Sequence, residues 1–134
     1  MDNCIFCRIL AGQAPADIIC ETDEVMVFLS FENHPLVVPK AHIPNLYTLA
    51  DPYDVALMRQ TVRVARAVKA GLACDGVLIA QANEPAAGQD VFHLHIHVYP
   101  RWHGDRSIYE LPPVRDVALR QARRERIAAA LERG

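Results

Sequence analysis

The chain has 134 residues, a length typical of one domain and sufficient to bury a real hydrophobic core. Its formal net charge of -2 argues against a nucleic-acid-binding protein. No apolar run is long enough to cross a bilayer, and the first residues lack the basic segment and apolar run of a secretory signal. We therefore expect a cytoplasmic protein without a membrane partner.

The first part of the chain alternates helical and strand patterns. A short helix is predicted first, and three strands rich in apolar and β-branched residues follow: the helix at 5–11 and the strands at 17–21, 25–31 and 36–39. The short link between the last two strands predicts that they are antiparallel neighbours.

A long helix is predicted after a single helical turn at residues 45–49. Asp51 is expected to cap its N-terminus, with Pro52 at the first helical position. An apolar stripe then continues at helical spacing, and Gly71 is expected to end the helix. Residues 77–80 form the next predicted strand.

A proline-rich stretch at residues 111–113 separates a final predicted helix, residues 116–131, from the rest. Four arginines on this helix would suit substrate phosphates, but interleaved acidic residues favour a solvated face: Arg120, Arg123, Arg124 and Arg126. The pattern predicts an α+β fold, an antiparallel β-sheet with one long helix and a C-terminal helix. Residues 1–110 are expected to form the main unit and 111–134 a helical extension of the same domain.

Three histidines alternate with apolar residues near the end of the predicted sheet. Because side chains of a strand alternate between its faces, His93, His95 and His97 are expected to share one face, with imidazoles roughly 6–7 Å apart. The apolar residues of the other face are expected to enter a core: Leu94, Ile96 and Val98. Pro100 should end this strand or let it continue only as an edge.

A row of histidines is poorly explained by packing alone, because each buried imidazole needs a hydrogen-bond partner. Two chemical interpretations are open at this point. The row could ligate a metal, or one histidine could act as a nucleophile or general base whose neighbours fix its tautomer. The small-residue loop before it, at 86–89, could offer backbone amides to an anion.

Two of the four cysteines, Cys4 and Cys7, form a C-x2-C pair. In a chain without a secretory signal, such a pair indicates a metal or redox site more than a structural disulfide. A tetrahedral site needs two more ligands, which distant histidines could supply. The alternative is a pair of free thiols on a loose N-terminus. Cys20 and Cys74 are isolated and are expected to be buried as small hydrophobic residues.

Three blocks in this chain, residues 4–12, 36–43 and 87–101, occur in the order found in one family. Together they resemble the histidine triad (HIT) superfamily of nucleotide hydrolases and transferases, whose pattern of histidines alternating with apolar residues fits residues 93–99 without a gap. The resemblance implies that His95 attacks the α-phosphate of a nucleotide and that His97 donates to a phosphate oxygen.

The resemblance also implies the roles of the surrounding residues. Gln89 would lie near the bridging oxygen of the scissile bond, and Gly88 would help to cradle the phosphate. His34 would support the active-site strand from behind. Metal-binding members of similar layout imply a structural zinc ion with four protein ligands and no catalytic cofactor: Cys4, Cys7, His42 and His93.

The chain departs from the family pattern where the ribose and phosphate are bound. The loop before the central strand is shortened, and Ser30 stands where many members carry a ribose-binding aspartate. Either Glu32 takes over the ribose contacts, or ribose recognition is weaker. Asn83 is expected to replace the usual asparagine after a loop shift. Glu84 occupies a glycine position, where a carboxylate would repel a phosphate.

Three functions fit these residues. The intact triad and Gln89 favour a nucleotidyl hydrolase that acts on a nucleoside phosphoramidate or a dinucleoside polyphosphate. The shortened loop and Glu84 favour a nucleotide-binding, adaptor-like protein with little turnover. A metallohydrolase with all three triad histidines as ligands would leave the 88–89 loop without a role. The resemblance further implies a homodimer.

Overall fold

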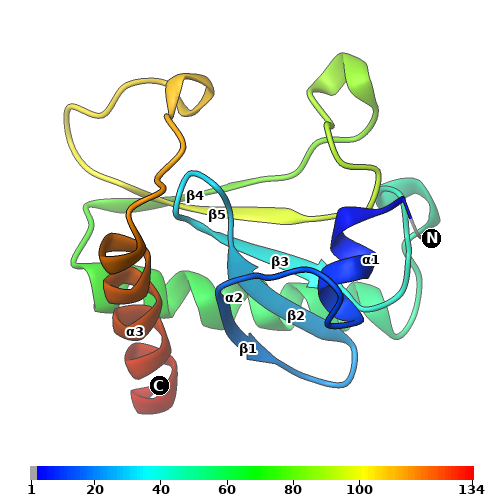
Figure 1. Ribbon diagram of the computed structural model, residues 1–134, viewed down its shortest axis with the longest axis horizontal. Coiled ribbons are helices and arrows are strands. Elements are labelled where there is room, and N and C mark those ends of the chain that lie inside the picture. Colours follow the sequence, from blue (N-terminus) through cyan, green and yellow to red (C-terminus); the bar gives the residue numbers. More distant parts are fainter. Residues whose placement is uncertain (1–2) are drawn as a thin grey trace.

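The computed structural model describes residues 3–134 and contains a five-stranded antiparallel sheet in the order β1-β2-β3-β5-β4 (Figure 1). Helices cover both faces of the sheet, and its antiparallel pairing throughout confirms the predicted α+β class. The strands are β1 Ile18–Glu21, β2 Val25–Leu29, β3 Pro35–Pro39, β4 Gly76–Ala80 and β5 Ile96–Arg101. The helices are α1 Ile5–Leu10, α2 Tyr53–Leu72 and α3 Val117–Arg133, with short 3-10 helices at Leu46–Thr48, Pro85–Ala87 and Ile108–Glu110.

The two faces of the sheet belong to two separate hydrophobic cores. Alternate residues of β2, Val25, Val27 and Leu29, pack with α2 and α3 in the larger core. Met26 and Phe28 point the other way and pack with Phe6 and Ile9 of α1 in the smaller core. Coverage on both sides explains why β2 and β3 are continuous apolar runs and not alternating ones.

A tight turn joins β2 to β3, which pair in register from Val25 opposite Pro39 to Leu29 opposite Pro35. The amide of Ser30 donates to the carbonyl oxygen of His34 at 2.8 Å, and Asn33 adopts a positive φ of 72°. The predicted antiparallel pairing is confirmed. The turn holds Ser30 and His34 side by side at the edge of the functional site.

The expected N-terminus of the long helix is wrong by about one residue. Pro52 is the capping residue and not the first helical one, α2 begins at Tyr53, and no side chain caps its amides. The helix also continues past Gly71 to Leu72, and Ala73 in the left-handed region ends it.

Gly71 has a packing role instead. A Cβ atom at this position would lie 2.6 Å from the carbonyl oxygen of Arg126, so only glycine lets α3 approach α2 this closely. The Nε atom of Arg126 donates to the carbonyl oxygen of Gly71 at 3.0 Å. Ile127 and Ala130 bury the inner face of α3 in the larger core.

The regular part of β5 begins only at Ile96, so the expectation of one strand through all three histidines is wrong. The segment before β5 contacts the loop after β3, because the amide of Leu94 donates to the carbonyl oxygen of Ile43 at 2.7 Å. The strand runs through Pro100, which pairs on one side with Val77, whereas the β3 ladder extends only along the first part of β5. Pro100 therefore occupies a one-sided position, as expected.

The prediction of a solvated arginine face on α3 is wrong for Arg120 and Arg123. The guanidinium of Arg120 pairs with Asp17 at 2.7 Å and donates to the carbonyl oxygen of Ser30 at 2.8 Å. Arg123 donates to the carbonyl oxygen of Asn33 at 3.0 Å. These contacts fasten the C-terminal helix to the β2–β3 turn.

Candidate active site and metal centre

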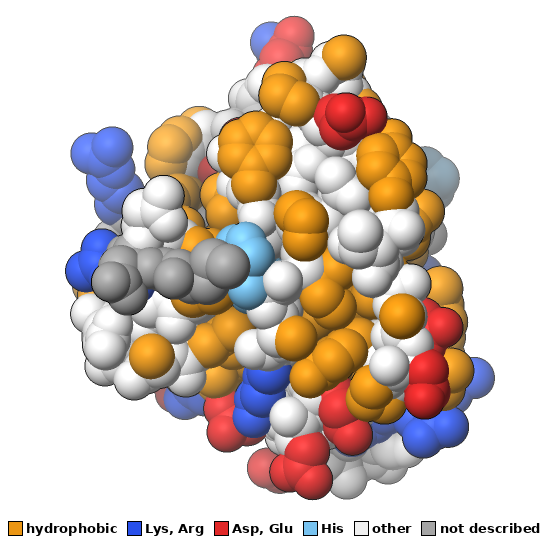
Figure 2. Space-filling model, turned by 90° about the vertical axis from the view of Figure 1, so that its right-hand side faces the viewer, with side chains coloured by type: hydrophobic (Ala, Val, Ile, Leu, Met, Phe, Trp, Pro, Cys, Tyr) orange, Lys and Arg blue, Asp and Glu red, His pale blue; other side chains and the backbone are white. Residues whose placement is uncertain are grey.

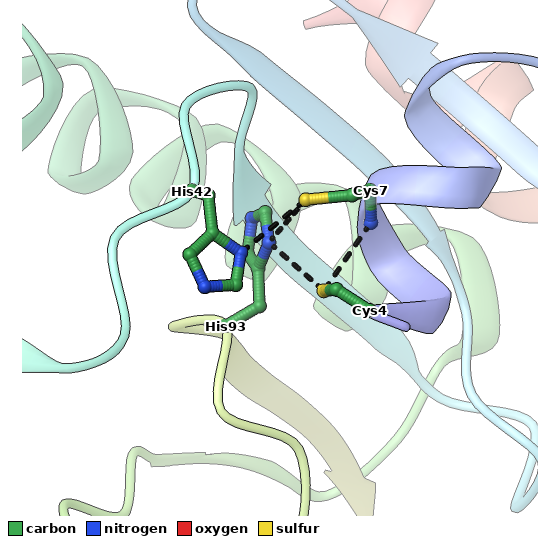
Figure 3. A group of neighbouring side chains, drawn as sticks. All are labelled: Cys4, Cys7, His42 and His93. Atoms are coloured by element: carbon green, nitrogen blue, oxygen red, sulfur yellow. Dashed lines mark hydrogen bonds between the residues drawn. The ribbon is translucent and has the colours of Figure 1, made fainter. Parts of the chain in front are cut away.

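A cluster of two thiols and two imidazoles connects the N-terminus of α1 to the loop after β3 and to the segment before β5 (Figure 3). The Sγ atom of Cys7 lies 3.3 Å from Nδ1 of His42 and 3.5 Å from Nδ1 of His93. The Sγ atom of Cys4 lies 3.5 Å from the same nitrogen of His93. All four ligand atoms lie within 4.8 Å of one another, so the structure brings together all four predicted metal ligands.

The donor set and its spacing fit a zinc ion. A tetrahedron with Zn–S bonds of about 2.3 Å and Zn–N bonds of about 2.0 Å has edges of about 3.5 Å, close to the spacing found here. The Nε2 atom of His93 donates to the carbonyl oxygen of Pro39 at 2.8 Å, which leaves Nδ1 free for a metal. Four protein ligands make a closed site without an open position for substrate.

The next histidine, His95, is held in a single tautomer. Its Nδ1 atom lies 2.8 Å from the backbone carbonyl oxygen of His93, which can only accept, so Nδ1 carries the proton. In the neutral ring Nε2 is then unprotonated. The ring is buried and packs edge-on against Phe6 of α1, with centroids 5.2 Å apart. This is the geometry that a nucleophilic imidazole needs.

His97 and His34 form a buried hydrogen-bonded pair. The Nδ1 atom of His97 lies 2.9 Å from Nε2 of His34, and Nδ1 of His34 lies 2.8 Å from Oγ of Ser30. The hydroxyl of Tyr99 lies 3.1 Å from Nδ1 of His97. The rings of His95 and His97 are 4.9 Å apart, closer than the expected 6–7 Å, because His95 precedes the regular strand.

Both members of this pair are neutral at physiological pH. Burial, with the neighbouring His97 second, lowers the pKa of His34 from 6.5 to about 3. Burial, with the neighbouring His95 second, lowers the pKa of His97 to about 4. Each neutral ring therefore carries one proton, and its hydrogen-bond partners determine which of its two nitrogens carries that proton.

The loop before the triad is braced by the side chain of Gln89. Its Oε1 atom accepts from the amide of Glu84 at 2.7 Å, and its Nε2 donates to the carbonyl oxygens of Pro44 at 2.6 Å and Val91 at 3.1 Å. Gly88 completes the loop with a φ of 96°, which an L side chain rarely adopts. The predicted contact of Gln89 with a bridging oxygen stays a prediction, and bracing is its role in the free protein.

The side chain of Asn83 also connects two loops. Its Oδ1 atom accepts from the amide of Leu46 at 2.8 Å, and Glu84 accepts from the hydroxyl of Tyr47 at 3.1 Å. Both contacts join the 81–89 loop to the 43–49 segment. The predicted substrate role of Asn83 remains to be tested, whereas the carboxylate of Glu84 is engaged by Tyr47.

Two carboxylates flank the histidines, and the sequence argument missed one of them. The Oδ1 atom of Asp90 lies 3.8 Å from Nε2 of His95. Burial and the charge of Asp90 raise the pKa of Glu32, and Arg120 opposes this shift. The signal for Asp90 was its position directly after Gln89 in the triad segment. Ser30 turns inward to His34, which leaves Glu32 as the freer of the two predicted ribose ligands.

The face that carries α1 shows apolar side chains gathered around a histidine (Figure 2). Within residues 3–134, no helix combines the length and apolar character that crossing a membrane requires.

Comparison with known proteins identifies similar sequences. A family model for the HIT domain matches residues 11–104. The chain is 36% identical over 105 residues to Protein hit of Bacillus subtilis, covering 75% of this chain and 72% of that protein. It is 30% identical over 104 residues to the adenylylsulfatase HINT3 of Arabidopsis thaliana, covering 75% of this chain and 53% of that protein.

A solved structure supports the metal centre. The crystal structure of a Zn-bound histidine triad family protein from Mycobacterium smegmatis is 34% identical, with a TM-score of 0.83, and covers 98% of this chain and 95% of that chain. With the thiol and imidazole cluster described above, this similarity indicates that the cluster is a zinc site.

Proposed function

Because this chain belongs to the histidine triad family, we propose that it is a nucleotidyl hydrolase or transferase. The substrate in this proposal is a nucleoside phosphoramidate or a dinucleoside polyphosphate, cleaved at the α-phosphate through a nucleotidyl-histidine on His95. The product is a nucleoside monophosphate. The observation that carries the proposal is the hydrogen bond from Nδ1 of His95 to the carbonyl oxygen of His93, because it leaves Nε2 as a free nucleophile.

In the first step, Nε2 of His95 attacks the α-phosphorus and forms a P–N bond. The bond from phosphorus to the leaving group breaks, and the leaving group departs with the electron pair and takes a proton from solvent. His97 donates a hydrogen bond to a phosphate oxygen as negative charge develops there. The ring of His97 is buried and neutral, so its single ring proton is the one that it donates.

In the second step, water attacks the phosphorus of the nucleotidyl-histidine. The P–N bond breaks, its electron pair returns to Nε2 of His95, and the proton of the attacking water passes to solvent. The hydrogen bond to His93 holds the imidazole in the same orientation through both steps. Splitting the reaction in this way replaces one difficult displacement by two easier ones.

The charges around His95 favour the phosphoramidate over the polyphosphate. Asp90 lies 3.8 Å from the attacking nitrogen, and Glu32 is close enough for the two carboxylates to interact. An amine leaving group carries no negative charge, whereas a polyphosphate carries several, which these carboxylates repel. The similarity to a plant adenylylsulfatase supports a small leaving group on a nucleotide.

The test is release of AMP from adenosine 5′-phosphoramidate by the zinc-loaded protein. The wild-type protein should release AMP, and His95→Asn should bind the nucleotide without releasing it. Binding without turnover by the wild-type protein would overturn the hydrolase proposal. The outcome would then favour an adaptor-like protein, an alternative supported by the inward orientation of Ser30, which leaves the ribose one partner fewer.

We also propose that the protein forms a homodimer. The outer side of α2 exposes Val55, Met58 and Val62 at 55%, 58% and 39%. The edge strand β4 exposes Ile79 on the face of the sheet that α2 covers, and Leu78 on the opposite face. Burial between two copies would remove this apolar surface from water. Sedimentation equilibrium should give twice the chain mass, and a monomer at micromolar concentration would contradict the proposal.

A further inference from the structure

We infer that Ser30 is a positioning residue: acting through His34, its hydroxyl holds the ring proton of His97 on Nε2. In the proposed reaction, Nε2 is the nitrogen that donates to the phosphate. The role of this proton rests on the proposed function, whereas the hydrogen-bond chain is present in the free protein. Ser30 would then serve catalysis and not the ribose.

The order of the protons follows from the partners of Ser30. Its Oγ atom accepts the backbone amide of His34 at 3.3 Å, which leaves the hydroxyl proton available for Nδ1 of the same residue at 2.8 Å. With Nδ1 as an acceptor, neutral His34 carries its proton on Nε2 and donates it to Nδ1 of His97 at 2.9 Å. Neutral His97 must then carry its own proton on Nε2.

The reverse order is unfavourable for two reasons. If His97 donated to His34 and His34 donated to Ser30, the hydroxyl proton of Ser30 would have no acceptor among residues 3–134. The unprotonated Nε2 of His97 would then present its lone pair to an anionic phosphate. The hydroxyl of Tyr99, 3.1 Å from Nδ1 of His97, is an alternative donor to the single lone pair of that nitrogen, and its donation would also leave the ring proton on Nε2.

The turn around Ser30 fixes the hydroxyl where this chain of bonds requires it. Ser30 is buried, with 7% of its surface exposed, and His34 is 1% exposed. Both backbone groups of Ser30 are engaged: its amide donates to His34, and its carbonyl oxygen accepts from Asn33 at 3.1 Å and from Arg120 at 2.8 Å. The shortened loop therefore directs the side chain toward His34 and away from solvent.

Nitrogen-15 NMR of histidine-labelled, zinc-loaded protein tests the proton order directly. His97→Gln identifies the His97 signals by their loss. In the wild-type protein we expect a proton on Nε2 of His97 and none on Nδ1. A wild-type protein with the His97 proton on Nδ1 would overturn the inference before any variant of Ser30 is made.

Kinetics with adenosine 5′-phosphoramidate test the consequence. Ser30→Ala should populate both tautomers of His97 and lower kcat by about ten- to hundredfold, with KM changed by less than about threefold. Ser30→Thr keeps the hydroxyl and should restore both the tautomer and kcat. Thr22→Ala is the matched control, because it removes a hydroxyl that accepts the amide of Val25 in the β1–β2 turn, away from the histidines.

The outcomes separate the two proposals. An increase in KM with unchanged kcat and an unchanged His97 tautomer in Ser30→Ala would assign Ser30 to ribose binding and overturn the inference. Absence of turnover by the wild-type protein would remove the proposed function, and the NMR result would still decide whether Ser30 sets the proton order.

Discussion

The backbone carbonyl oxygen of His93 accepts a hydrogen bond from Nδ1 of His95 at 2.8 Å. The side chain of His93 belongs to the zinc cluster, so one residue connects the metal centre to the proposed nucleophile. Phe6, which lies between the two cysteine ligands in sequence, packs edge-on against both rings, with centroids 5.8 and 5.2 Å apart. Phe6 and His93 therefore belong both to the surroundings of the zinc site and to those of the proposed active site.

Loss of a zinc ligand should affect stability more than chemistry. Cys7→Ala should abolish stoichiometric zinc binding and lower the free energy of unfolding by several kcal/mol, because zinc binding contributes about 10 kcal/mol or more to small zinc domains. The fall in kcat of the remaining folded protein should stay below about tenfold. Metal analysis, urea unfolding and AMP release measure the three quantities.

Cys20→Ala is the matched control for this variant. Cys20 is a partly exposed thiol of β1 outside the cluster, so its replacement should leave the zinc content unchanged. A Cys7→Ala protein that is fully stable yet inactive would contradict a structural role for the zinc.

The buried histidine pair should make the protein less stable in acid. Folding lowers the pKa of His34 to about 3 and that of His97 to about 4 from 6.5. Between pH 6.5 and about 4 the unfolded chain therefore binds protons that the folded chain does not. The free energy of unfolding should fall as the pH decreases through this range, by up to about 1.4 kcal/mol per pH unit for each histidine.

Urea unfolding at a series of pH values checks this slope. Zinc ligands also take up protons in acid, so the readout is the difference between variants. His34→Gln should show a shallower slope than the wild-type protein, and replacement of the exposed His103 by Gln should not. Equal slopes for all three proteins would contradict the assignment.

Asp90 should determine the choice of leaving group. Its carboxylate lies 3.8 Å from Nε2 of His95, but its side chain is 83% exposed, so salt screens its effect. Asp90→Asn should raise the ratio of kcat/KM for diadenosine tetraphosphate to that for adenosine 5′-phosphoramidate by about two- to tenfold at low salt. Asp23→Asn, the same charge change in the β1–β2 turn, should leave the ratio unchanged. A ratio that falls in Asp90→Asn would refute this role.

Arg120 should stabilise the β2–β3 turn from α3. Its guanidinium, 13% exposed, contacts Asp17 and the carbonyl oxygen of Ser30. Arg120→Ala removes the ion pair with Asp17 and one of the two hydrogen bonds to the carbonyl oxygen of Ser30, and should cost about 1–3 kcal/mol of stability. Arg124→Ala, which removes one longer contact to the carbonyl oxygen of Ile18, should cost much less. Thermal unfolding of both variants is the measurement, and equal losses would show that the contacts of Arg120 have no special effect.

The sequence was sufficient for features that depend on local pattern or on ligand chemistry. Apolar runs rich in β-branched residues predicted β2 and β3, and the short link between them predicted their antiparallel pairing. The cysteine pair, together with the two histidines that the family resemblance implied, gave the four zinc ligands that the structure brings together. The apolar partners of the histidines, Leu94 and Val98, enter the larger core as expected.

The predictions that were wrong concern features that depend on contacts between distant parts of the chain. The alternation of histidines and apolar residues does not show that the amide of Leu94 donates to the carbonyl oxygen of Ile43. With this contact, the regular strand β5 begins only at Ile96. The interleaved charges of α3 predicted solvated arginines, yet Arg120 donates a hydrogen bond to the carbonyl oxygen of Ser30, 90 residues away in the sequence. The inward orientation of Ser30 likewise depends on the three-dimensional turn and not on residue type.

Intact-protein mass spectrometry during turnover of adenosine 5′-phosphoramidate, with a quench that avoids acid, detects the proposed nucleotidyl-histidine itself. We expect a transient adduct of one AMP moiety on the wild-type protein and none on His95→Asn. Release of AMP by wild-type protein with no adduct, or by His95→Asn at a near-normal rate, would contradict a nucleotidyl-histidine on His95.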